Sequence, residues 1–412
     1  MIGSTRSART ALVAILVAFI FAQPGHAQMR TDLAGNWRGE FIIRDSIRAP
    51  FQFEIDSTGK VFMLNGEERF ETSNIQVTAD SMFLPLDQFD NELAFVVTGG
   101  EMTGVLRRQD HAGSPTRFIA KKGNLKRFNV AEHSFRNVSG SYDVTFEFES
   151  GNKEKAVAIF QQRGEVLTGT FLKPSGDTRF LEGTVAGNRF YLSSFIGSSP
   201  GYFEGVISAD GRISGFQAGT KVKHKFSGRL NNKAKLADPF SVSLLKKGHS
   251  TIDFALPDTS GKMISLKDEK YRGKVVILAI TGTWCPNCID EAAFLSPWYK
   301  DNKQRGVEII TIHFERQADT AFTKKVMGRF RKRFNITYDQ VFGGMANNES
   351  VLNAIKGLET FSSFPTTIFV GTDGKVSKIH SGYSGPATGK FYTDFVEEFN
   401  AEVDHLLESS AR

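Results

Sequence analysis

The sequence contains very little cysteine. Only Cys285 and Cys288 occur among 412 residues, and two residues separate them. Small exported domains that depend on disulfides for stability carry many more cysteines. A disulfide between these two would close a very short loop and would restrict the unfolded chain only slightly. A disulfide framework is therefore excluded, and the two cysteines are expected to have a reactive role and not a stabilising one.

Metal-binding motifs are also absent from the sequence. A structural zinc site needs two further cysteine or histidine ligands at matched spacing, and there is no second cysteine pair. None of the following histidines belongs to a ligand motif: His111, His133, His224, His313 and His380. We expect surface or structural roles for the first three, and neither a metal nor another cofactor.

A strong excess of one charge is missing as well. The formal net charge is +6, and removing residues 1–27, with Arg6 and Arg9, leaves +4. Nucleic-acid binding requires basic side chains gathered into a footprint, so this mild excess gives no reason to expect it. The densest basic cluster, within residues 324–333, is threaded by apolar side chains four residues apart. That spacing predicts an amphipathic helix with a solvated basic face; docking of an acidic partner is the alternative.

The apolar run at the N-terminus is short. Residues 11–22 span 12 residues, whereas a helix needs about 20 to cross a bilayer. Two arginines precede the run, and Pro24 and a small-x-small step at 25–27 follow it, which is typical of a secretory signal. We expect cleavage before Gln28 and a periplasmic protein; an uncleaved membrane anchor is the weaker alternative. Because no cysteine lies near this site, a lipid-modified N-terminus is excluded.

Residues 28–236 are predicted to form an antiparallel all-β region. Apolar and polar residues alternate in runs such as 51–55 and 142–148, which indicates strands with one buried face. Turn sequences of the hairpin type occur at 57–60, 175–177 and 209–212.

The same region contains a sign of duplication. Residues 33–37 and 138–142, which lie 105 positions apart, share an apolar-small-Gly-polar-aromatic pattern that opens a strand. Repeats at about 30–125 and 133–231 predict two sequential β-barrel or sandwich lobes, with one larger sandwich as the alternative.

An α/β domain is expected over residues 248–412, after a polar and basic linker at 237–247. Residues 275–280 are continuously apolar, as in a strand that helices bury on both faces. The pattern predicts these further elements: a hairpin over 253–266, a helix to about 304, a strand at 307–313, the basic helix, a hairpin over 366–380 and a helix at 391–407.

The cysteine motif lies between the buried strand and the following helix. Cys285 therefore falls at a helix N-terminus, where unpaired amides and the helix dipole favour a thiolate, and it is expected to be the attacking sulfur. Cys288 lies one turn further on, within reach to resolve a mixed disulfide. Together they complete a cycle of disulfide exchange.

Two acidic residues follow the motif. Glu291 lies one turn beyond Cys288, and if it is buried its raised pKa would let it take the proton of Cys288. The alternative is an exposed acid near the helix start. Asp290 points elsewhere on the helix and is expected to be solvated.

Residues 363–367, Ser-Phe-Pro-Thr-Thr, precede an apolar strand, a position where a cis proline is used. A cis bond before Pro365 would turn the adjacent backbone outward, where it can pair with an extended client chain. We therefore expect Phe364 and Thr366, together with Trp284 beside Cys285, to contact the client.

The C-terminal part resembles the thioredoxin-like thiol-disulfide oxidoreductases of the TlpA and ResA type, in the AhpC/TSA-redoxin superfamily. The resemblance covers about 248–407 and rests on the following residues in this order: Pro257-Asp258, Gly273-Lys274, the run from Gly282 to Cys288, Glu291, Phe364-Pro365-Thr366 and Asp373-Gly374-Lys375. It implies a thioredoxin fold, Cys285 as nucleophile, Cys288 as resolving thiol, Glu291 as the acid near them, and a cis Pro365. One departure is that Pro297 comes later than the proline that many members place soon after the glutamate.

The leading interpretation is an exported reductase that takes electrons from a membrane-bound thiol donor and exchanges disulfides with client proteins through their cysteines. The motif itself fixes exchange and not its direction, so an oxidant or isomerase is an alternative. A peroxiredoxin-like peroxidase is another, weakened because the two cysteines have the spacing of a dithiol exchanger. From a different class, the β region could capture a partner, with the C-terminal domain as scaffold.

Overall fold

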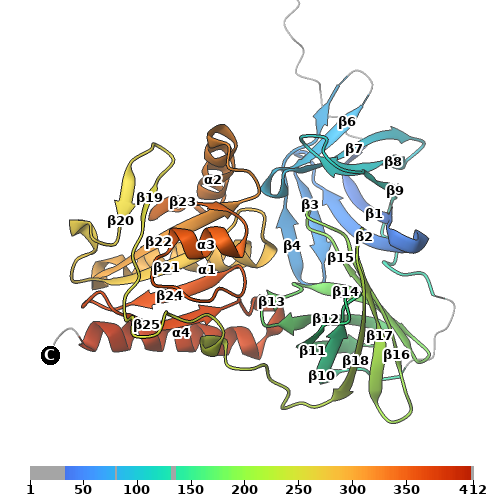
Figure 1. Cartoon of the computed structure of the whole chain (residues 1–412). Coiled ribbons are helices and arrows are strands. Elements are labelled where there is room, and N and C mark those ends of the chain that lie inside the picture. The colour runs from blue at the N-terminus through green and yellow to red at the C-terminus, as the bar shows by residue number, and fades with distance from the viewer. Residues whose placement is uncertain (1–32, 79–80, 131–135, 410–412) are drawn as a thin grey trace, which may run out of the picture.

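The computed structural model describes residues 33–78, 81–130 and 136–409. The expected signal sequence and His133 lie outside these residues. The chain forms two β lobes and an α/β domain, with both lobes on the same side of that domain (Figure 1). The predicted multidomain architecture, an antiparallel β region followed by a thioredoxin-like α/β domain, is confirmed.

The first lobe is an open, curved half-barrel of antiparallel strands in the order β4-β3-β2-β1-β9-β8-β7-β6-β5. Its strands are β1 (Gly35–Ile42), β2 (Arg48–Ile55), β3 (Val61–Asn65), β4 (Glu68–Glu71), β5 (Gln76–Val77), β6 (Met82–Leu86), β7 (Asn91–Thr98), β8 (Glu101–Arg108) and β9 (Thr116–Lys122). A short 3-10 turn, η3 (Asp87–Phe89), follows β6. Alternating phenylalanines fill the concave face, as in β2, where Phe51 and Phe53 are buried.

The second lobe is a closed barrel, because β11 pairs with β12 as well as with β10. Its strands are β10 (Gly140–Glu147), β11 (Lys153–Arg163), β12 (Val166–Lys173), β13 (Gly176–Asp177), β14 (Leu181–Ala186), β15 (Arg189–Ser194), β16 (Gly201–Ile207), β17 (Arg212–Ala218) and β18 (Lys223–Leu230). Closure leaves the main ladder without a free edge, whereas β4 and β5 are the edges of the first lobe.

The duplication predicted from the sequence is visible in local geometry. Trp37 Nε1 donates to the carbonyl oxygen of Leu33 at 2.8 Å, and the Tyr142 hydroxyl donates to that of Val138 at 3.2 Å. Both motifs place a left-handed glycine between these partners, with φ of 126° and 127° at the two positions. The repeated sequence pattern therefore encodes the same strand opening in each lobe, and the single-sandwich alternative is wrong.

The α/β domain has a five-stranded sheet in the order β23-β22-β21-β24-β25. Its elements are β19 (Ala255–Pro257), β20 (Met263–Ser265), β21 (Val275–Thr281), α1 (Pro286–Asn302), β22 (Val307–Glu315), α2 (Thr320–Phe334), β23 (Asp339–Met345), α3 (Asn348–Ala354), β24 (Thr366–Val370), β25 (Val376–Ser381) and α4 (Lys390–Ser409). The apolar run in β21 lies at the centre of the sheet, with every residue buried. Strands β21, β22, β23 and β25 run in the same direction, and β24, between β21 and β25, runs antiparallel to them.

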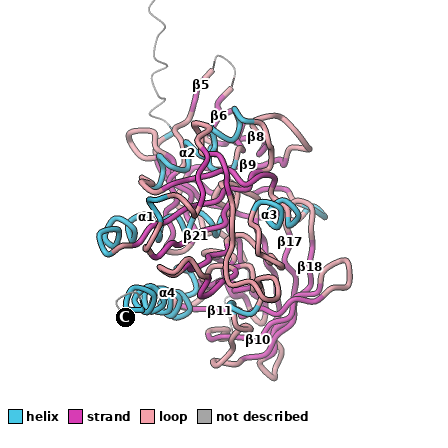
Figure 2. Tube along the Cα trace, turned by 60° about the vertical axis from the view of Figure 1, so that its left-hand side comes forward, coloured by secondary structure: helices cyan, strands magenta, loops and turns pink. Residues whose placement is uncertain are grey.

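Helices cover both faces of this sheet. Alternate β21 residues Val275 and Ile277 share an apolar cluster with α1, α2 and α4, while Val276 and Leu278 pack with α3 and the β19–β20 hairpin. Figure 2 shows α1 and α3 on opposite sides of β21. Helix α1 continues through Pro297 to Asn302. Among the described residues, no helix is both long and apolar enough to cross a membrane.

Two elements of the α/β domain, β23 and α3, were not predicted from the sequence. The β23 sequence, Asp-Gln-Val-Phe-Gly-Gly-Met, contains two glycines and no sustained alternation, as its place at the sheet edge permits. Helix α3 has only seven residues, too few for a periodic apolar stripe to be read.

The three parts of the chain are packed together through buried apolar side chains. Phe195, which follows β15, lies between the lobes with its ring centre 4.6 Å from that of Phe41 and 5.5 Å from that of Phe51. The same buried cluster includes Phe89 of the first lobe and Phe330 of α2.

The segment expected to be a linker, 237–247, also contacts the α/β domain. The Ser243 and Ser381 hydroxyl oxygens are 2.7 Å apart and buried, and Leu245 forms a β-bridge with Leu358. The domain boundaries at 236/237 and 247/248 stay a prediction.

Candidate active site

Cys285 is the N-cap of α1, directly after the loop that leaves β21. The backbone N–H of Cys288 donates to the Cys285 sulfur at 3.3 Å. One of the free amides of the first helical turn is thereby satisfied by sulfur, in the way that a side-chain oxygen usually caps a helix. The loop is tight, since a Cβ on Gly282 would lie 2.5 Å from Trp284 Nε1 and 2.8 Å from the Phe314 carbonyl oxygen.

The two sulfurs differ in accessibility. Cys285 is 6% exposed and Cys288 is fully buried, and both are free thiols. Burial raises the pKa of Cys288 well above its usual value, and its contact with Cys285 and the charges of Cys285 and Glu291 add to this effect. Cys288 therefore needs a proton acceptor before it can act as a thiolate.

Glu291 supplies a carboxylate inside the same part of the core. It is 2% exposed, and its Oε1 accepts a hydrogen bond of 2.6 Å from the Thr367 hydroxyl. Burial raises its pKa to about 7, which the Thr367 hydrogen bond only partly offsets. The alternative of an exposed acid is wrong, and the carboxylate can exchange a proton near neutral pH.

The Phe364–Pro365 bond is cis, as expected. The Phe364 carbonyl oxygen lies 3.7 Å from the Cys285 sulfur, so this loop borders the nucleophile directly. Phe364 also packs edge-on against Trp284, with ring centres 5.5 Å apart. Thr366 is fully buried and its hydroxyl donates to the Ser363 carbonyl oxygen. Any contact of Thr366 with a client would therefore come from its backbone.

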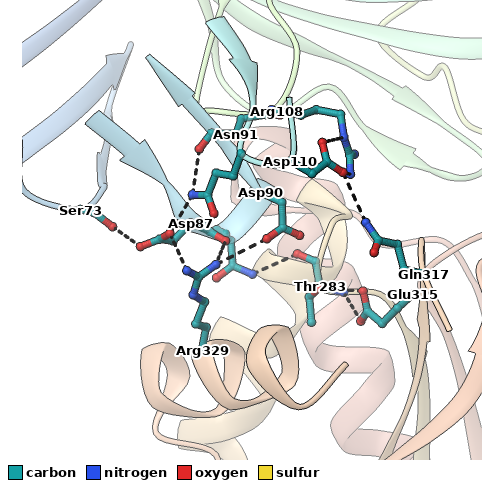
Figure 3. Close-up of polar contacts among 12 residues, drawn as sticks. Ser73, Asp87, Asp90, Asn91, Arg108, Asp110, Thr283, Glu315, Gln317 and Arg329 are labelled. Carbon is teal, nitrogen blue, oxygen red and sulfur yellow. Dashed lines mark hydrogen bonds and ion pairs between the residues drawn. The ribbon is translucent and has the colours of Figure 1, made fainter. Parts of the chain in front are cut away.

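Thr283 and Trp284 form hydrogen bonds with residues at the end of β22. Trp284 Nε1 donates to the Phe314 carbonyl oxygen at 3.0 Å. The Thr283 amide and hydroxyl both donate to the buried Glu315 carboxylate, at 3.0 and 2.8 Å (Figure 3). The guanidinium carbon of Arg316 lies 5.0 Å from the centre of the Trp284 ring.

His313 and His380, two of the histidines of the domain, are core residues in this structure. His313 is fully buried, with its Nε2 2.9 Å from the Gln340 amide nitrogen. His380 Nδ1 lies 3.1 Å from the Gly382 carbonyl oxygen. Within residues 33–78, 81–130 and 136–409, no cluster of three histidine, cysteine or acidic side chains has the arrangement to hold a metal.

Both β lobes contact the backbone of the cysteine motif. Gln88 of the first lobe donates to the Thr283 carbonyl oxygen at 3.0 Å. Arg179 of the second lobe donates to the Pro286 carbonyl oxygen at 2.9 Å, and the Asn287 amide donates to the Ser175 carbonyl oxygen at 3.5 Å. These contacts could not be predicted from the sequence, because residues in the β region carry no spacing that relates them to the motif.

Arg179 is also the centre of a buried charge cluster. It forms ion pairs with Glu68 of the first lobe and, at 2.5 Å, with Asp290 of α1. Burial raises the pKa of Asp290 to about 7 and that of the neighbouring Asp177 to about 6, against the effect of the Arg179 charge. One guanidinium cannot neutralise three carboxylates, so a proton is retained near neutral pH. The expectation that Asp290 is solvated is wrong.

The basic face of α2 is only partly solvated. Arg329 pairs with Asp87 at 2.9 Å and Asp90 at 3.4 Å, both in the first lobe (Figure 3). Arg333 donates to the Glu71 carbonyl oxygen at 3.0 Å. The acidic surface that this part of the helix meets therefore belongs to the same chain.

Comparison with known proteins places the C-terminal domain in a family. The AhpC/TSA family model matches residues 248–379. The chain is 32% identical over 138 residues to the thiol-disulfide oxidoreductase ResA of Bacillus subtilis (strain 168), covering 34% of this chain and 69% of that protein. It is 33% identical over 135 residues to ResA of Geobacillus thermodenitrificans (strain NG80-2), covering 33% and 69%.

Solved structures are similar to the same part of the chain. A thiol-disulfide oxidoreductase from Bacteroides fragilis NCTC 9343 matches with a TM-score of 0.27 and 19% identity, over 36% of this chain and 99% of that one. From the sequence relatives and the family model, the chain belongs to the ResA-type thiol-disulfide oxidoreductases of the AhpC/TSA family, through its C-terminal domain.

Proposed function

We propose that this protein is an exported reductase that exchanges disulfides with client proteins through Cys285 and Cys288. The observation that carries the proposal is the placement of Cys285 as the cap of α1, 3.7 Å from the Phe364 carbonyl oxygen, with Cys288 buried one turn below. The nucleophile borders a loop whose backbone can pair with a client chain. The resolving thiol is shielded from other oxidants.

The exchange proceeds in two steps. The Cys285 thiolate attacks one sulfur of a client disulfide; that bond breaks, and the client's other sulfur leaves as a thiolate and takes a proton from water. Cys288 then gives its proton to the Glu291 carboxylate and attacks the Cys285 sulfur, which releases the client's second thiol. The client gains two electrons, and Cys285 and Cys288 form a disulfide. A membrane-bound thiol donor returns the two electrons, and no metal, nucleic acid or cofactor takes part.

A trapping experiment tests the roles of the two cysteines. The reduced Cys288→Ser variant is mixed with oxidised insulin, and the products are separated without reductant. Because the variant cannot resolve the intermediate, a mixed disulfide should accumulate. Excess thiol should cleave this mixed disulfide. Reduced wild type should instead release reduced insulin. An equal amount of adduct with the Cys285→Ser variant, which keeps only Cys288, would reject Cys285 as the nucleophile.

If the protein is exported, its N-terminal residue should show that the signal sequence has been cleaved. When the full-length chain is expressed in a bacterium with a periplasm, the protein recovered from that compartment should begin at Gln28. Intact mass and N-terminal sequencing measure this directly. Recovery of the chain with residues 1–27 still attached would favour the membrane-anchor alternative.

A further inference from the structure

A cleft of about 620 Å³ lies where the three parts of the chain meet. The first lobe contributes residues around the end of β8, the second lobe contributes 198–200 and 220–221, and the α/β domain contributes Arg316. All three parts therefore build it, and the α/β domain alone would lack most of its wall.

The charged side chains described in the lining of the cleft are all basic. Among the described residues that line it are Arg107, Arg108, Lys221 and Arg316, and none of them is an aspartate or glutamate. Arg107 and Arg108 have acid partners outside the lining, at 2.8 and 2.6 Å. Lys221 and Arg316 are exposed, and their side chains make no ion pair or hydrogen bond with other described residues. Two positive charges are thus available to a ligand.

Arg316 connects the cleft with the reacting cysteine. Its guanidinium covers the Trp284 ring, and Trp284 precedes Cys285 in the chain. Although part of the side chain is exposed, loss of solvent around the guanidinium lowers the pKa of Arg316, and the charge of Arg108 adds to this effect. The charges of Asp90, Glu315 and the Cys285 sulfur act in the opposite direction. A carboxylate bound by Arg316 would therefore lie beside the entrance to the redox centre.

We propose that this cleft binds an acidic segment of the client, next to the client's reacting cysteine, and that Arg316 and Lys221 contact its carboxylates. This inference rests on the proposed function, since it names the class of client that the redox centre accepts. Attraction between a cationic cleft and an acidic segment speeds encounter and selects among partners.

Binding of a peptide pair tests the cleft without redox chemistry. Two labelled peptides of one sequence carry serine in place of cysteine, flanked either by glutamates or by glutamines. Fluorescence anisotropy at low ionic strength, with the full chain, should show the glutamate peptide binding at least about fivefold more tightly, as expected for exposed charge pairs. The Arg316→Gln, Lys221→Gln variant should lose that preference, and Arg316→Lys should keep most of it.

The matched control is Arg163→Gln, Lys247→Gln, which removes two exposed charges outside the cleft and should keep the preference. Equal binding of both peptides to wild type, or an unchanged preference in the cleft variant, would overturn the proposal. In a second arm, disulfide-linked forms of both peptides are offered to the reduced protein. If the glutamate preference in binding persists while neither disulfide is reduced, the cleft stands and the proposed function fails.

Discussion

Replacing Arg179 with leucine should destabilise the chain by about 3–5 kcal/mol, because the change leaves buried carboxylates without their cation. The side chains of Arg179, Glu68 and Asp290 are only 9%, 8% and 14% exposed. Their mutual attraction offsets a desolvation cost that remains when the guanidinium is removed. Chemical denaturation at pH 7 measures the loss, which should shrink as the pH is lowered and the carboxylates take up protons.

A second arginine in the same lobe provides the control. Arg189 pairs with Glu204, but its own side chain is 51% exposed, and the Glu204 carboxylate would keep the hydrogen bond of 3.0 Å that it accepts from the Tyr202 hydroxyl. Arg189→Leu should cost at most about 1 kcal/mol. If Arg179→Leu were no more destabilising than Arg189→Leu, the buried cluster would have no part in holding the lobes to α1.

Replacing Glu291 with glutamine should slow the release of a client from Cys285 by about 100-fold at pH 8, since a positioned base typically contributes at least this much. In wild type, release should accelerate as the pH rises through about 7, the pKa that burial gives Glu291. The variant should lose this inflection. Single-turnover release of a fluorescent peptide from a preformed mixed disulfide measures both effects, and an unaltered pH profile would reject the proton-acceptor role.

The Glu291→Gln substitution should also change how the free energy of unfolding depends on pH. A carboxyl whose pKa is raised from 4.5 to about 7 by folding binds more protons in the folded state between these values. The contribution of Glu291 to the free energy of unfolding is therefore favourable at low pH. That free energy falls by up to about 3 kcal/mol as the pH rises from 4.5 towards 7. Glu291→Gln should remove this dependence and be more stable than wild type above pH 7. Glu398→Gln, at an exposed position of α4, should leave it unchanged.

Local sequence signals predicted much of the fold and the chemical core of the site. The continuous apolar run at 275–280 identified the central strand, because helices bury both of its faces. Cys285 and Cys288 could be placed on one helix turn from their spacing alone. The repeated Gly-x-aromatic steps at 35–37 and 140–142 marked the start of each lobe, because the glycine permits a backbone that other residues disfavour.

Other parts of the site depend on tertiary contacts that no local pattern records. Asp290 was expected in solvent because its own helix offers it no partner, yet Arg179, more than one hundred residues earlier, covers it. Gln88 has no distinguishing neighbours in the sequence, and it reaches Thr283 only because the first lobe packs on α2. β23 and α3 were likewise not predicted, because their sequences show neither strand nor helical periodicity.

The hydrogen bonds from both lobes to the backbone on either side of Cys285 bear on how the protein should be dissected. A fragment starting at residue 248 would keep every residue that the family model matches, yet it would leave the carbonyl oxygens of Thr283 and Pro286 without the donors they have in the intact chain. It would also turn the apolar surface around Phe330 towards water. Rates and potentials measured on such a truncation would describe a different environment for the thiols, so quantitative work calls for the undivided polypeptide.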